Sequence, residues 1–171
     1  MTDEERLAAA FAFAAQKHSG QLRKGGEPYI THPAAVAQWL KERGFDTDTQ
    51  ITGLFHDLLE DTDATEKEIL ALSDERVLKA VKLLTKTKGY VMADYVAGIM
   101  TDETAKAVKT ADRIHNLRSA VTCDEDFRRR YIAESRQWFL GLSPEVGEAA
   151  DALEKTLEPP SGDQIKNNNQ E

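Results

Sequence analysis

The chain has almost no cysteine and no long apolar run, and both absences narrow the class of protein. Cys123 is the only cysteine among 171 residues, so an internal disulfide framework and a cysteine-rich zinc site are excluded. No stretch approaches the ~20 consecutive apolar residues that a membrane-spanning helix needs. The opening residues MTDEERLAAA lack the basic region and apolar segment of a signal peptide. We therefore expect a cytoplasmic protein with no membrane partner.

Positive charge is scarce relative to negative charge. The chain has 22 Lys and Arg residues against 30 Asp and Glu residues, a formal net charge of −8. Because affinity for a nucleic-acid backbone comes mostly from clustered Lys and Arg, we expect no nucleic-acid partner. Hydrophobic residues make up 40% and charged residues 30%, which is typical of one folded globular domain. Any chemistry must then use His, Asp and Glu.

Apolar residues recur at helical spacing, and no alternating run is convincing as a strand. A capping box at Thr2 and Glu5 begins the first helix, Thr31 is expected to cap the second, and one continuous helix is expected to carry Ile51 to Leu59. The sequence predicts an all-α fold, a single bundle of about eight helices over residues 1–158. We expect the tail, residues 159–171, to be disordered.

Polar residues interrupt an apolar helix in LFHDLLEDT, residues 54–62. At ~100° per residue, His56 and Glu60 share one side of a helix, and Asp57 and Asp61 repeat that pairing one position further on. Burying three carboxylates without a cation is costly. A divalent metal ion would offset that cost, so this segment predicts a metal site.

A second set of polar residues lies in KTADRIHNLRSAV, residues 109–121. The apolar side of this helix is marked by Val108, Ala111, Ile114 and Val121. A polar strip lies beside it and contains Asp112, His115, Asn116 and Ser119. Such a strip at the edge of a core usually lines a cleft. Two interpretations of His115 are open: it has no role at the site, or it orients Asp112 or another ligand. Arg118 is expected near the middle of the apolar side, where a buried arginine must pair with a carboxylate.

His32, at the predicted start of the second helix, completes a set of four potential metal ligands. The set consists of His32, His56, Asp57 and Asp112. Two imidazoles and two carboxylates suit an ion such as Mn²⁺ or Fe²⁺, whereas zinc often binds at thiolate-rich sites. Zinc is not excluded as the bound ion.

The order of these four residues resembles that of the HD metal-dependent phosphohydrolase superfamily. Three longer segments are similar to the hydrolase domain of RelA/SpoT-type enzymes and to stand-alone small alarmone hydrolases: GQLRKGGEPYITHP, LFHDLLEDT and KTADRIHNLRS. The resemblance covers roughly residues 5–142. It implies an HD-domain fold and Mn²⁺-dependent hydrolysis of the nucleotides ppGpp and pppGpp to GDP or GTP plus pyrophosphate.

The resemblance also implies roles for individual residues. His32, His56, Asp57 and Asp112 would bind the metal ion. Glu60 and Asp61 match the family's acidic pair beside the attacking water, and so would be catalytic.

The remaining implied roles concern substrate binding. Arg23 and Lys24 match a basic pair near the nucleotide, while Asn116 and Ser119 fall on the nucleotide-contacting helix. Tyr29 is open between loop packing and stacking on guanine. Gly25 and Ser119 depart from the family, which commonly has serine and threonine at these positions.

Other functions remain open at this point. One is an HD phosphohydrolase of another nucleotide, either a 5′-nucleotidase or an NADPH phosphatase, and another is a catalytically silent nucleotide-binding or antitoxin module. The oligomeric state is also open, with a homodimer among the options, since Trp39, Trp138 and Phe139 suit either a core or a subunit contact. His18 is interpreted as a core histidine.

Overall fold

The structure, a computed structural model, describes residues 1–157 and 159. These residues form ten α-helices and one short 3₁₀ helix, with an isolated bridge between Leu22 and Pro28 and no strand. The helices are α1 (Asp3–Lys17), α2 (Thr31–Glu42), α3 (Thr47–Phe55), α4 (Leu58–Asp61), α5 (Glu66–Ala71), α6 (Glu75–Leu84), α7 (Met92–Met100), α8 (Glu103–Ser119), η1 (Ala120–Thr122), α9 (Glu125–Trp138) and α10 (Pro144–Glu154). The all-α prediction is confirmed. Apart from Pro159, the predicted tail lies outside the described residues.

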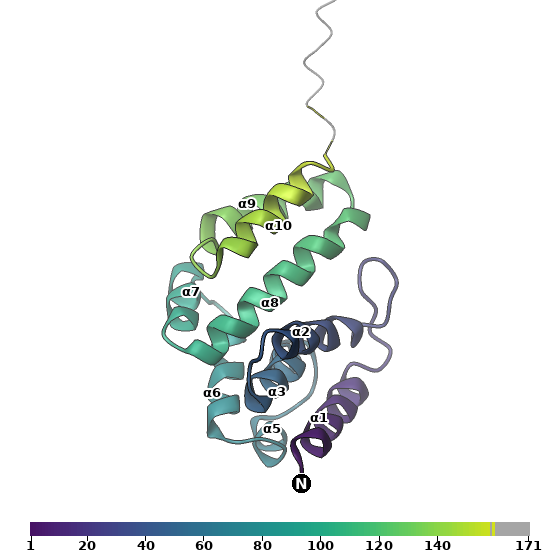
Figure 1. Ribbon diagram of the computed structural model, residues 1–171, viewed down its shortest axis with the longest axis vertical. Coiled ribbons are helices and arrows are strands. Elements are labelled where there is room, and N and C mark those ends of the chain that lie inside the picture. Colours follow the sequence, from purple (N-terminus) through teal and green to yellow (C-terminus); the bar gives the residue numbers. More distant parts are fainter. Residues whose placement is uncertain (158, 160–171) are drawn as a thin grey trace, which may run out of the picture.

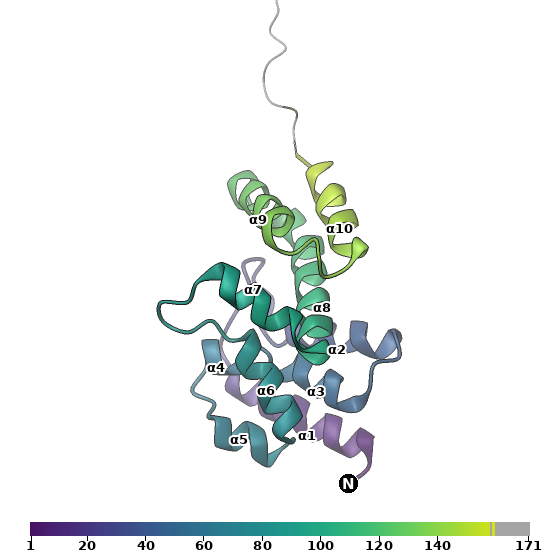
Figure 2. The same ribbon diagram turned by 90° about the vertical axis from the view of Figure 1, so that its left-hand side faces the viewer.

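Helix α8 is the central element of the fold. It packs against α2, α3, α6 and α7, and also against α9 and α10. Figures 1 and 2 show α9 and α10 along the C-terminal part of α8, with α1 to α6 gathered around its other end. In the described residues no helix is both long enough and apolar enough to cross a membrane.

Two apolar clusters form the core. The larger surrounds α8 and includes Leu117 and Phe139, while the smaller lies among α1, α3, α5 and α6 and includes Phe55 and Ile69. Phe139 is fully buried there, whereas Trp39 and Trp138 are partly buried against the same cluster. Because α2 and α3 contact α8 and each other, the N-terminal end of α2 and the C-terminal end of α3 lie beside the middle of α8.

The expected continuous helix over residues 51–59 is broken at His56 and Asp57. The chain turns there, so α3 ends at Phe55 and α4 begins at Leu58. His56 Nδ1 lies 2.6 Å from the carbonyl oxygen of Gly53, the acceptor that the Asp57 amide would use in an unbroken helix. A side chain that takes a backbone acceptor competes with the helix. The predicted side-by-side pairing of His56 with Glu60 on one helix was therefore wrong.

Two other local predictions were also wrong. Thr31 is the first residue of α2 and donates from Oγ1 to the Pro28 carbonyl oxygen at 2.8 Å, so it does not cap the helix. Arg118 is exposed, and the buried arginine of α8 is Arg113, because α9 and α10 cover the side of the helix on which Arg113 lies. Its guanidinium bonds to Glu134 at 2.9 Å.

Candidate metal centre and adjoining pocket

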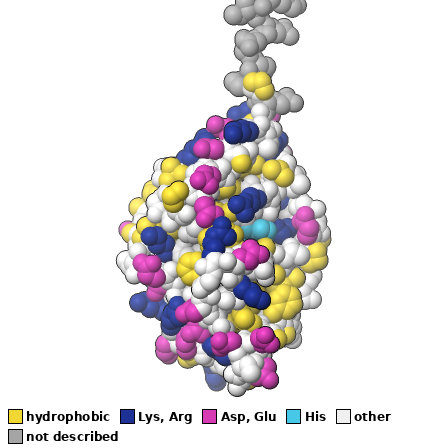
Figure 3. Space-filling model, viewed as in Figure 1, with side chains coloured by type: hydrophobic (Ala, Val, Ile, Leu, Met, Phe, Trp, Pro, Cys, Tyr) yellow, Lys and Arg dark blue, Asp and Glu magenta, His cyan; other side chains and the backbone are white. Residues whose placement is uncertain are grey.

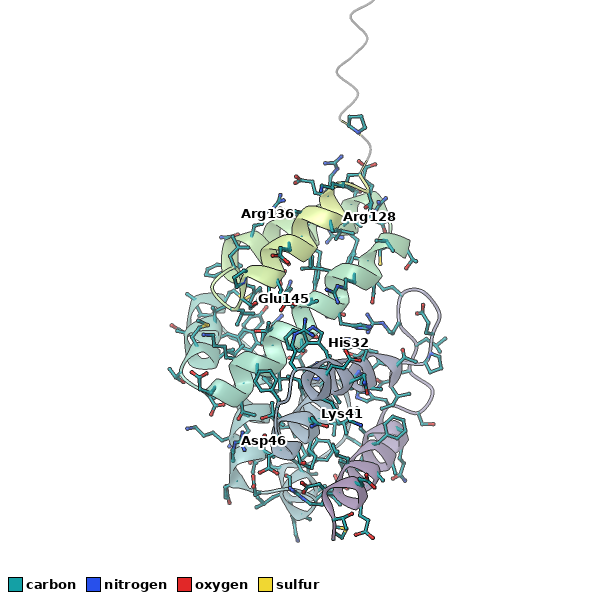
Figure 4. The ribbon with its side chains drawn as sticks, in the orientation of Figure 1. His32, Lys41, Asp46, Arg128, Arg136 and Glu145 are labelled. Atoms are coloured by element: carbon teal, nitrogen blue, oxygen red, sulfur yellow. The ribbon has the colours of Figure 1, made fainter. Side chains whose placement is uncertain are left out.

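Side chains from three segments meet in the middle of the molecule, where Figure 4 shows His32 of α2 near α8. One potential ligand atom from each of His32, His56 and Asp57 lies within 4.8 Å of the others, close enough to share an ion. Asp112 of α8 adjoins them, because its Oδ1 lies 2.8 Å from His32 Nε2 and 3.4 Å from His56 Nε2. The structure thus brings together all four residues that the sequence nominated as ligands.

The hydrogen bonding of His56 fits a bound cation. A carbonyl oxygen only accepts, so the Nδ1 atom facing Gly53 carries a proton. His56 Nε2 is buried without a hydrogen-bond partner in the described residues, although Asp57 Oδ2 lies 3.1 Å away. A neutral ring would direct its Nε2 lone pair at a carboxylate, which is unfavourable, whereas a metal ion would join the two. Metal-binding histidines usually donate their other N–H in this way.

Each carboxylate of the centre is held by a further side chain. The Tyr29 hydroxyl donates to Asp57 Oδ2. Asp112 Oδ1 also accepts from Asn116 Nδ2 at 3.0 Å, while its Oδ2 lies 3.2 Å from the buried ammonium of Lys109. Sequence reasoning missed Lys109. Its signal was a charged residue three positions before Asp112, on a helix whose apolar side is buried.

The ionisation of these groups follows from burial opposed by neighbouring charges. Burial alone would lower the pKa of His56, but Asp57 and Asp112 outweigh it and raise that pKa well above its ordinary value. Burial would raise the pKa of Asp112, yet Lys109, His32 and His56 hold it well below its usual range. In the metal-free protein the centre is therefore a cluster of opposite charges, which a divalent cation can enter by displacing protons.

The two acidic residues expected to be catalytic differ in their surroundings. Both side chains are exposed, and Glu60 Oε1 accepts from the backbone N–H of Lys86 at 2.7 Å. Partial desolvation of its carboxyl group, together with the charges of Asp57 and Glu60, raises the pKa of Asp61 to about 6. Asp61 is thus the member of the pair that can exchange a proton near neutral pH.

A cavity of about 430 Å³ adjoins the metal centre, between the loop before α2, the C-terminal part of α8, and α9. Its lining includes all five predicted substrate-binding residues: Arg23, Lys24, Tyr29, Asn116 and Ser119. Figure 3 shows basic side chains around a partly exposed histidine on the face of the molecule seen in Figure 1.

Some of these lining residues bond across the cavity. Arg23 Nη2 donates to Asn116 Oδ1 at 3.0 Å, and Lys24 Nζ lies 3.7 Å from the centre of the Phe127 ring. Ser119 donates within its own helix, to the His115 carbonyl oxygen at 2.8 Å.

Two aromatic residues of the cavity wall escaped sequence reasoning. Phe127 and Tyr131 lie one turn apart on α9, with ring centres 5.5 Å apart and planes at 13°. Their only sequence signal was an i, i+4 aromatic pair within DEDFRRRYIAES, a segment whose charges indicate a solvated helix start. Tyr29 belongs to both the cavity and the candidate metal centre, because it lines the cavity and its hydroxyl bonds to Asp57.

A histidine–aspartate metal centre in an all-helical fold defines the HD class of domain. Residues 10–93 match the family model described as "HD domain". The matched range contains His32, His56 and Asp57, and Asp112 lies beyond it. The chain carries an HD domain, and this class is built around a divalent metal ion.

Comparison with individual proteins points to one group of HD-domain proteins. The chain is 34% identical over 177 residues to the guanosine-3′,5′-bis(diphosphate) 3′-pyrophosphohydrolase of Aquifex aeolicus, covering 95% of this chain and 25% of that one. It is 34% identical to the bifunctional (p)ppGpp synthase/hydrolase SpoT of Escherichia coli K12, covering 84% and 22% of the two chains. The chain therefore spans about a quarter of the length of these relatives.

A solved structure shows the same fold. It is reported under the heading "A metazoan ortholog of SpoT hydrolyzes ppGpp and plays a role in starvation responses" and superimposes with a TM-score of 0.74. The match covers 88% of this chain and 94% of that one at 22% identity.

Proposed function

We propose that the protein is a Mn²⁺-dependent phosphohydrolase that removes the 3′-pyrophosphate of ppGpp and pppGpp, releasing GDP or GTP and pyrophosphate. The names of its relatives support this reaction. The observation that carries the proposal is that the metal centre and the cavity share residues. Tyr29 and Asn116 line the cavity and also bond to Asp57 and Asp112. A nucleotide in the cavity would hold its phosphates beside the ion.

The proposed chemistry divides between the ion and the chain. A bound divalent ion would lower the pKa of water and polarise a phosphoryl oxygen. We assign proton transfer to Asp61, whose pKa of about 6 suits exchange near neutral pH. Glu60, held by the Lys86 amide, would orient the water. Mn²⁺ is the proposed metal because the donors are two imidazoles and two carboxylates.

Substrate binding is proposed for the cavity lining. Arg23 can bind a pyrophosphate with two parallel N–H bonds once it leaves Asn116, and Lys24 adds a second positive charge. The parallel rings of Phe127 and Tyr131 offer an apolar wall for the purine base. Ser119 and Asn116 supply polar contacts on the opposite side.

The direct test is hydrolysis of ppGpp by the purified protein, with Mn²⁺ and with EDTA, followed by identification of the products. We expect GDP and pyrophosphate only with metal. Asp57→Ala should abolish both turnover and metal binding, and Asp94→Ala, at an exposed position on α7, is the matched control. Hydrolysis of 5′-monophosphates or NADPH but not ppGpp would replace this proposal with another phosphohydrolase. Metal-loaded protein that hydrolyses none of them would be a binding module.

The acidic pair is tested separately. Asp61→Asn should lower kcat by roughly 10²–10⁴ while leaving Mn²⁺ affinity unchanged. Glu60→Gln should also lower kcat, by a smaller factor, because the neutral amide still meets the Lys86 N–H. Unchanged kcat in either variant would remove that residue from the mechanism. The cytoplasmic location and the homodimer stay predictions.

A further inference from the structure

We propose that His115 links the metal centre to the substrate pocket through its two ring nitrogens. Nδ1 accepts a hydrogen bond from the metal ligand His32, and Nε2 consequently presents an N–H to the anionic oxygens of the substrate. The second half of this inference rests on the proposed function.

The contact between the two histidines is direct. His32 Nδ1 lies 2.8 Å from His115 Nδ1, while the ring centres are 5.0 Å apart and the planes differ by 27°. Because the nitrogens are much closer than the ring centres, the rings meet edge to edge through these atoms. A hydrogen bond between two nitrogens needs one proton, so one Nδ1 donates and the other accepts.

The metal-free arrangement sets the direction of this bond. His32 Nε2 lies 2.8 Å from Asp112 Oδ1, and a carboxylate only accepts, so in the neutral form of the His32 ring the single proton is on Nε2. His32 Nδ1 is then an acceptor, and His115 donates to it from Nδ1. In this state His115 Nε2 has no proton.

Binding a metal ion through His32 reverses that direction. A His32 ring that binds an ion through Nε2 keeps its one proton on Nδ1 and must donate it to His115. His115 Nδ1 becomes the acceptor, so its own proton moves to Nε2. The bond between the rings persists, but every donor and acceptor along it is exchanged.

The freed N–H points away from the metal ligands. In an imidazole the two nitrogens face different directions, so a ring that meets His32 through Nδ1 directs Nε2 elsewhere. His115 lines the cavity beside Asn116 and Ser119, and its ring is partly exposed. Nε2 has no hydrogen-bond partner among the residues that the structure describes. A loaded metal centre would therefore prepare a hydrogen-bond donor in the pocket.

The proton positions can be measured without any substrate. The chain contains four histidines, so ¹⁵N-histidine NMR at pH 8 can resolve each ring. Zn²⁺ is the probe, because Mn²⁺ would broaden the signals. We expect the His115 proton on Nδ1 in EDTA-treated protein and on Nε2 after Zn²⁺ addition. A proton on the same His115 nitrogen in both states would overturn the proposal.

Two substitutions separate the two nitrogens. The Oδ1 of His115→Asn occupies the position of Nδ1 and keeps the acceptor for His32, while removing the donor that faces the pocket. His115→Gln places an amide near the position of Nε2 and removes that acceptor. Calorimetric titration measures the affinity of each variant for Mn²⁺. We expect the Kd of His115→Asn to lie within about threefold of the wild-type value, and that of His115→Gln to be at least about tenfold higher.

Kinetics should show the reverse order. The KM for ppGpp should rise by about tenfold or more in His115→Asn, because a hydrogen bond to a charged group is lost, and by less in His115→Gln at saturating Mn²⁺. Equal losses of Mn²⁺ affinity in both variants, at matched thermal stability, would overturn the inference. Absence of ppGpp turnover in the wild type would overturn the proposed function instead, leaving the NMR and affinity results to decide the link to His32.

Discussion

At the scale of single residues, the candidate metal ligands are held by partners that a motif does not specify. Lys109 is the clearest case, since its ammonium is buried between Asp112 Oδ2 at 3.2 Å and the Tyr95 hydroxyl at 3.3 Å. Tyr95 in turn donates to the Leu84 carbonyl oxygen. This series of contacts holds Asp112 Oδ2 away from the histidines and leaves Asp112 Oδ1 facing them.

Removing this buried cation should destabilise the metal-free protein. We expect Lys109→Met to lower the free energy of unfolding by about 3–5 kcal/mol, because Asp112 loses its buried countercharge. Lys79→Met is the matched control, since Lys79 is 71% exposed and lies 3.9 Å from Asp102, and it should cost less than about 1 kcal/mol. Urea denaturation in EDTA measures both. Equal losses in the two variants would show that the buried pair adds nothing.

The raised pKa of Asp61 predicts a pH dependence of stability. The folded protein holds this proton up to about pH 6, whereas the ordinary carboxyl value is 3.8. Between these values the folded state binds more protons than the unfolded state, so this group lowers stability as pH rises. In the metal-free protein, Asp61→Asn should therefore become more stable than the wild type above pH 6, with the difference vanishing below about pH 4. A pH-independent difference in urea midpoints would contradict this assignment.

At the scale of helices, the close approach of α2 and α3 brings His32 near His56. Gly53 makes this approach feasible. A Cβ atom there would lie 3.0 Å from Leu40 Cδ1 and 3.2 Å from Val36 Cγ1, which is closer than ordinary packing allows. The carbonyl of the same residue accepts the His56 ring proton, so Gly53 serves both the packing and the ligand orientation.

We expect Gly53→Ala to weaken metal binding as well as stability. Forcing α2 away from α3 should cost about 1–3 kcal/mol, offset by roughly 1 kcal/mol of helix propensity, and Mn²⁺ affinity should fall because His32 moves with α2. Gly147→Ala in α10, where the added Cβ lies at an ordinary 3.5 Å from Leu140, should leave affinity unchanged. Calorimetric titration checks both, and equal affinity in the two variants would contradict the packing argument.

At the scale of the whole molecule, the candidate metal centre brings together side chains from α2, the end of α3 and α8, and these helices contribute to both apolar clusters. An ion that binds only the folded state stabilises all of these contacts at once. The HD centre is thus expected to act as a cross-link between the two halves of the core.

Metal binding should raise the thermal stability of the full chain. At a free Mn²⁺ concentration of about 100 times Kd the gain is roughly 2.7 kcal/mol, or about 5–10 °C in Tm for a chain of this size. EDTA should reverse the shift, and Asp57→Ala should show none. Scanning calorimetry with and without Mn²⁺ measures the effect, and an identical Tm in the wild type under both conditions would show that the cluster binds no ion.

Much of the site could be predicted because its signals are local. The ligand types, their order and the helical character of their segments depend on neighbours within a few positions, and the chain carries them in LFHDLLEDT and KTADRIHNLRS. Phe127 and Tyr131 were missed because the cavity that they line is completed by other segments of the chain. Lys109 was missed for a different reason: its partner Asp112 lies on the same helix, but its burial beside Tyr95 depends on the packing of α7 against α8.

The sequence by itself determined the all-helical fold and the identity of the four side chains that could bind a metal ion, because periodicity and residue chemistry are properties of short segments. The tertiary structure decided which arginine of α8 is buried, where the helix breaks at His56, and which nitrogen of His32 meets His115. Those outcomes depend on how helices distant in the chain pack together, and residue spacing along a single helix does not contain that information.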